Sequence, residues 1–163
     1  MPDGLPPVAE PIALLFKINN SLVHRGLEGL SDDQAWQQLE GKGNPIAWIV
    51  GHITETRGQI LGLLGAPWDA GWGGKFKRGG ELYDRFAYPT RAEIEARFTE
   101  THDSMRSAFA TLTGQALEAA APVSFAGAKT LADLLAFFAF HEGYHLGQLG
   151  YIRKQLGHSS LVG

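Results

Sequence analysis

Hydrophobic positions recur at helical spacing in four separate stretches of the chain. The first stretch follows Pro11, the second follows Asn44-Pro45, the third follows Thr90 and the fourth follows Thr130. Apolar residues three and four positions apart line one face of an α-helix, whereas a half-buried strand alternates with a period of two. No stretch shows sustained alternation. The pattern therefore predicts four amphipathic helices.

Local signals place the ends of these helices. Thr90 and Glu93 have the spacing of a capping box, as do Thr130 and Asp133, and Gly157 stands where a C-cap is expected. Four such helices with short and long connections favour an all-α, antiparallel four-helix bundle over another all-α packing. We expect one domain over residues 1–163, with residues 1–10 as a flexible N-terminal extension.

The composition narrows the class of protein. Of 163 residues, 44% are hydrophobic and 19% are charged, and the net charge is -3. This composition is typical of a globular protein. The chain has no run of basic residues that would indicate nucleic acid as a partner. Without cysteine there is no disulfide, thiolate zinc site or cysteine nucleophile. No signal peptide or membrane-length apolar segment is visible, so we expect a cytoplasmic protein that does not enter the membrane.

The fourth stretch carries two histidines on its predicted apolar stripe. This stripe consists of Leu131, Leu134, Phe138, His141, His145, Gln148 and Ile152. His141 and His145 are four residues apart, so their side chains lie one above the other on a helix. Two buried imidazoles need polar partners, and one shared metal ion would satisfy both. The alternative is a pair of hydrogen-bonded core histidines.

The letters from His141 to His145 also match the H-E-x-x-H pattern of zinc proteases. No Asp or Glu follows Glu142, and the downstream glycine and histidine of the extended pattern are absent. The protease interpretation therefore fails, and a third ligand has to come from upstream. His52 lies mid-helix after Gly51, which allows close approach by another helix, and is the better candidate. His102 remains an alternative.

Two segments resemble a known family. The segment from Asn44 to Ile53, NPIAWIVGHI, is similar to the second-helix motif of DinB-like proteins (the DinB/YfiT superfamily), and HEGYHLGQLG, from His141 to Gly150, is similar to their fourth-helix motif. The resemblance implies a four-helix bundle with a long connection, often dimeric. It also implies a metal held by one histidine of helix 2 and two of helix 4, which here are His52, His141 and His145.

Such a site suggests a function but not a single reaction. Three imidazoles favour zinc or nickel and leave a coordination position open, as in catalytic sites. Relatives in the superfamily include enzymes that use a low-molecular-weight thiol, so the resemblance implies a thiol S-transferase-like reaction on a small molecule. A metal-dependent amide or ester hydrolase and a non-catalytic metal-binding bundle remain alternatives.

Further residues are candidates around the site. Glu55, three residues after His52, is a candidate to hydrogen-bond a metal ligand or to act as a general base, and Gln148 is a candidate to orient His145 or contact substrate. For Glu142 we expect a surface or helix–helix role, because it points away from His141. Residues 66–89 predict a long loop without regular structure, rich in glycine and aromatic residues. We expect this loop to lie against the metal, with Trp72, Lys77 and Arg78 contacting a carboxylate-bearing ligand.

Overall fold

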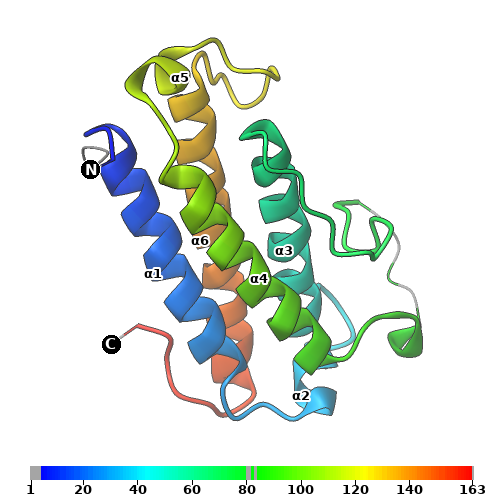
Figure 1. The fold of residues 1–163 in the computed structure, drawn as a ribbon. Coiled ribbons are helices and arrows are strands. Elements are labelled where there is room, and N and C mark those ends of the chain that lie inside the picture. Colours follow the sequence, from blue (N-terminus) through cyan, green and yellow to red (C-terminus); the bar gives the residue numbers. More distant parts are fainter. Residues whose placement is uncertain (1–4, 80–81, 83, 163) are drawn as a thin grey trace.

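Four long helices dominate the computed structural model, which describes residues 5–79, 82 and 84–162 (Figure 1). They are α1 (Ala9–Leu27), α3 (Ile46–Leu63), α4 (Arg91–Phe109) and α6 (Leu131–Gln155). The connections contain the short helices α2 (Asp32–Trp36) and α5 (Gly114–Glu118) and a 3-10 turn, η1 (Arg85–Ala87). The all-α prediction is confirmed over the described residues. None of the helices described is long and apolar enough to cross a membrane.

The direction of the long helices differs from the prediction in one respect. In α1 and α6, Asn19 lies beside Ala139 and Gly26 beside Leu149, so these two helices run in the same direction. The two helices α3 and α4 are also parallel (Figure 1). The bundle is therefore not antiparallel throughout, because the long connection returns the chain to the opposite end of the bundle before α4 begins.

The ends of the helices largely follow the local signals. Both predicted capping boxes form, at Thr90 and at Thr130, and Gly157 takes a positive φ of 85° after α6. Pro45 stands at the N-cap position of α3 and makes no side-chain capping bond. The extension predicted over residues 1–10 is too long, because α1 begins at the fully buried Ala9; residues 1–4 of that prediction lie outside the described residues.

The buried face of α6 is rotated from the predicted stripe. Its buried residues are Leu131, Leu134, Leu135, Ala139, Glu142, Leu146, Leu149 and Arg153. His141 and His145 are only partly buried, on the flank that faces α3. Glu142 occupies the centre of the face, fully buried, which excludes the predicted surface role and leaves the helix–helix one. The rotation places the histidines at the edge of the core, where a small molecule can reach them.

Candidate metal centre

His52 is held in place by its own helix and by the long loop. The indole of Trp48, one turn earlier on α3, stacks on the His52 ring at a centroid distance of 5.2 Å. The carbonyl oxygen of Phe76 lies 2.8 Å from Nδ1 of His52. The ring of Phe76 packs against Gly51, where a Cβ atom would lie 2.3 Å from it. The close approach predicted at Gly51 is therefore real, but the partner is the loop and not another helix.

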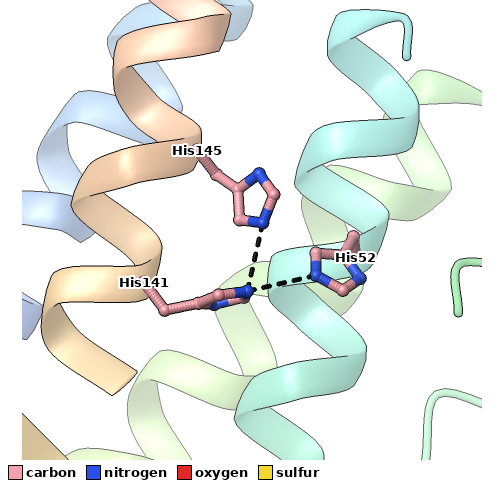
Figure 2. Close-up of side chains that lie close together, drawn as sticks. All are labelled: His52, His141 and His145. Atoms are coloured by element: carbon pink, nitrogen blue, oxygen red, sulfur yellow. Dashed lines mark hydrogen bonds between the residues drawn. The ribbon is translucent and has the colours of Figure 1, made fainter. Parts of the chain in front are cut away.

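His141 and His145 reach His52 from the facing helix. Figure 2 shows the three side chains pointing toward one another from α3 and α6. The Nε2 atom of His141 lies 3.4 Å from Nε2 of His52 and 3.1 Å from Nε2 of His145. All three ligand atoms lie within 4.8 Å of one another. The structure thus brings together the three histidines that the sequence singled out.

The hydrogen bonds around the rings determine which nitrogens are protonated. Nδ1 of His52 faces a carbonyl oxygen, and Nδ1 of His145 lies 2.8 Å from Oε1 of Gln148. Both oxygens only accept, so Nδ1 donates in each case and Nε2 keeps a lone pair. A neutral His141 ring carries a single N–H, so it cannot donate to the Nε2 lone pairs of both His52 and His145. Its own Nδ1 is buried without a hydrogen-bond partner among the described residues.

A divalent metal ion fits this arrangement. Two nitrogens bound at about 2.0–2.1 Å to a tetrahedral zinc ion are about 3.3 Å apart. The observed separations of 3.4 and 3.1 Å bracket that value. A cation shared by the three Nε2 atoms would use every lone pair that the hydrogen bonds leave free. The donor set therefore matches a metal centre better than a histidine hydrogen-bond cluster.

The electrostatics keep the imidazoles in the form that binds metal. Burial lowers the pKa of His52 and of His145, and it lowers the pKa of His141 to about 4, with further contributions from the two neighbouring histidines. The positive charge of Arg78 lowers the pKa of all three groups as well. The rings are therefore neutral at neutral pH, and little proton release is needed for metal binding.

The comparison with protein families agrees with this geometry. A model of the DinB superfamily matches residues 16–149. The chain belongs to the DinB superfamily. The match includes His52, His141 and His145 and confirms the resemblance seen in the two motifs. A search of curated proteins found no match to the chain.

In this DinB superfamily protein, a cavity of about 280 Å³ opens beside two of the histidines. It is lined by His52, Glu55, Thr56, Gln59, Gly74, Phe76, Lys77, Arg78, Phe125, Phe137, Phe138 and His141. Glu55 is half-buried, and burial raises its pKa while hydrogen bonding to the backbone of Phe76 and Gly74 lowers it by a smaller amount. The predicted neighbours Glu55, Lys77 and Arg78 thus line one cavity together with His52 and His141.

The remaining candidates lie as follows. Gln148 accepts from His145, the orienting contact that the sequence suggested. The ring of Trp72 packs against Phe76 at 5.0 Å and against the core, and it does not line the cavity. His102 borders a different groove, between α1 and α4, so it is not part of the histidine group. The prediction of a loop without regular structure is wrong in one place, because residues 85–87 form the 3-10 turn η1.

Sequence reasoning missed two kinds of contribution to this DinB-type site. The carbonyl of Phe76 orients His52, and a backbone atom leaves no signal in the residue pattern. Of the four phenylalanines that line the cavity, Phe125, Phe137 and Phe138 come from the connection before α6 and from α6 itself. Phe138 was assigned only to the apolar stripe of its helix. No pattern in the sequence around Phe125 indicates that its ring lines the same cavity as Phe138.

Proposed function

We propose that this DinB superfamily protein is a metal-dependent enzyme that acts on a small molecule, with thiol S-transfer as the reaction. The convergence of three Nε2 atoms at the edge of a cavity carries the proposal. A structural zinc site is usually closed by four protein ligands, whereas three ligands beside a hollow leave a position for a reactant. The thiol follows from the family resemblance, and the geometry is compatible with it.

The residues of the chain have separable roles in this proposal. His52, His141 and His145 would hold zinc or nickel, and Phe76 and Gln148 orient two of these ligands through their Nδ1 atoms. A bound ion would supply Lewis acidity, which favours the deprotonated form of a thiol or of water. Lys77 and Arg78 would attract an anionic reactant into the cavity.

A second candidate reaction is hydrolysis of an amide or ester. The observation that favours it is Glu55, a carboxyl that lines the cavity together with His52 and His141. Burial raises the pKa of Glu55, which makes its carboxylate a stronger base. In either reaction Glu55 would accept the proton released by the nucleophile, water in one case and thiol in the other.

The experiment has a metal readout and an activity readout. Chelated protein reloaded with zinc or nickel should contain about one equivalent of metal by elemental analysis. His52→Ala and His145→Ala should lower metal affinity by several orders of magnitude, because each removes a third of the donor set. The matched control is His102→Ala, which removes a histidine of the other groove and should bind metal like the wild type.

The activity readout separates the reactions. Metal-loaded protein is supplied with low-molecular-weight thiols and 1-chloro-2,4-dinitrobenzene, or with 4-nitrophenyl acetate in the absence of thiol. Thiol consumption that is lost in His145→Ala and slowed in Glu55→Gln supports transfer, and the same pattern with the ester supports hydrolysis. Full metal loading with no turnover in either assay would leave a non-catalytic metal-binding bundle, and absence of metal binding would overturn the proposal itself.

A further inference from the structure

The cavity beside the histidines has two chemically different sides. The long loop contributes the cations Lys77 and Arg78 to the cavity lining, whereas the rings of Phe125, Phe137 and Phe138 come from the connection before α6 and from α6 itself. A volume of about 280 Å³ lies at the lower end of the range for small-molecule sites, roughly 300–1,000 Å³. The ligand that fills it is therefore small, and it has to suit both sides.

The two cations of the cavity are available to a ligand. Among the other cations of the loop, Lys75 donates to the carbonyl of Ala87, and Arg85 pairs with Asp32. Lys77 and Arg78 are exposed and form no ion pair within the part of the chain that the structure describes. These two cations outnumber Glu55, the one carboxyl among the described residues that line the cavity, so the cavity favours an anion. A guanidinium can bind a carboxylate through two hydrogen bonds.

The aromatic side is preassembled but incompletely covered. Phe137 lies 4.9 Å from Phe125 and 5.7 Å from Phe138 between ring centroids, both in edge-to-face arrangements. Phe125 comes from the connection between α5 and α6 and remains 46% exposed. A ligand with an apolar ring would cover this surface and add further edge-to-face contacts. An aliphatic anion of the size of acetate would leave it uncovered.

We propose that the cavity binds a small carboxylate with one aromatic ring. Its carboxylate would meet Arg78 and Lys77, and its ring would lie against Phe125, Phe137 and Phe138. The inference deepens the proposed function, because it names the class of reactant that this same site takes. Its test is a binding measurement, so it does not depend on turnover.

The experiment compares three probes on one protein. Phenylacetate has both features, phenylacetamide lacks the charge, and acetate lacks the ring. Affinities are measured by isothermal titration calorimetry with zinc-loaded protein and again with chelator-treated protein. We expect phenylacetate to bind at least tenfold more tightly than either other probe with zinc, and to keep its rank, at lower affinity, without zinc.

Three variants assign the selectivity to the cavity. Lys77→Gln/Arg78→Gln should weaken phenylacetate binding at least tenfold while zinc affinity does not fall. Phe125→Ala should weaken phenylacetate severalfold and leave acetate unchanged. The control, Arg97→Gln/Arg106→Gln, removes the same charge from α4, where both side chains are exposed and neither lines this cavity. This variant should bind phenylacetate like the wild type.

Three results would overturn the inference. Equal affinity for phenylacetate and phenylacetamide would show that the cations do not bind the carboxylate. Equal affinity for phenylacetate and acetate would show that the rings contribute nothing, and unchanged binding in the Lys77 and Arg78 double variant would place the anion elsewhere. A protein that takes up no zinc but still prefers phenylacetate would refute the metal-dependent function and leave the cavity assignment standing.

Discussion

At the scale of single residues, Glu142 and Arg57 place opposite charges inside the bundle. Both side chains are fully buried, and two hydrogen bonds of 2.7 and 3.0 Å join them. Asn19 donates to the same carboxylate from α1, and the guanidinium lies over the ring of Phe98 at 4.3 Å. The pair thus connects α3 with α6, the two helices that carry the histidines. Glu142 follows His141 in the sequence, but its side chain is buried in the core of the bundle and not in the histidine group.

Removing one member of this pair should destabilise the protein strongly. Glu142→Gln keeps the size of the side chain but leaves the Arg57 charge buried without compensation, which costs about 3–5 kcal/mol of unfolding free energy. Urea unfolding of metal-free protein measures this cost without a contribution from bound metal.

Two further variants show whether the uncompensated charge is the cause. Arg57→Met/Glu142→Leu removes both charges and should lose less stability than Glu142→Gln alone. Asp103→Asn breaks the exposed pair with Arg106 and should change stability by less than about 1 kcal/mol. If Glu142→Gln is as stable as the wild type, this account of the core is wrong.

At the scale of elements, the loop after α3 is part of the metal site because it packs on Gly51. The ring of Phe76 is fully buried, and it can approach α3 only because position 51 has no side chain. The carbonyl of the same residue then accepts from His52. One contact between a loop and a helix therefore fixes the position of the loop and the orientation of a candidate ligand.

Gly51→Ala should test this coupling. The added methyl group would overlap the Phe76 ring, so the loop has to shift, at a cost of about 1–3 kcal/mol in unfolding free energy. Loss of the bond to Nδ1 of His52 should weaken zinc affinity by about 10–100-fold.

The control lies in the same helix. Gly62→Ala meets no atom within 4 Å and should retain both stability and zinc affinity. Calorimetric zinc titration and urea unfolding of the two variants provide the comparison. If Gly51→Ala binds zinc as the wild type does, the loop does not orient the ligand.

The same elements show what the sequence can predict. Capping boxes and an i, i+4 histidine pair involve residues a few positions apart, so their consequences are local and the helix ends and the ligand spacing follow from them. The direction of the crossover and the partner of Gly51 depend on contacts between distant segments. The pattern misplaces the buried face of α6 because apolar residues occur around most of that helix. The partners that explain why Glu142 faces inward, Arg57 and Asn19, lie on other helices.

At the scale of the whole molecule, an apolar surface remains on the outside of α1 and α6. Phe140 and Tyr151 of α6 are 66% and 62% exposed, and Leu15 and Ile18 of α1 are 45% and 44% exposed. Helical periodicity puts these α1 residues on the flank opposite the groove that faces α4, hence beside α6. Several large exposed apolar side chains on two neighbouring helices mark an interaction site more often than single exposed residues do.

We propose that a second copy of the chain covers this surface. Helical spacing puts the exposed Gly143 and Gly147 on the same outer face of α6 as Phe140. Apart from the backbone of α6 itself, no atom of the described residues lies within 4 Å of where their Cβ atoms would be. Projecting rings beside open glycine positions on one helix can interlock with an identical helix about a two-fold axis. The homodimer implied by the family resemblance would use this face.

Sedimentation equilibrium should therefore give about twice the chain mass of 17.7 kDa at micromolar concentration. Phe140→Glu and Ile18→Glu should each shift the protein to monomer, because a carboxylate would be buried at the centre of the interface without a partner. Phe86→Glu is the matched control: its ring is 91% exposed, but it lies on η1, away from α1 and α6, so this variant should remain dimeric. Zinc binding by the monomeric variants would show that each chain carries a complete site, as expected when all three histidines come from one chain. A wild-type protein that stays monomeric at these concentrations would refute the dimer and leave the apolar face without its proposed occupant.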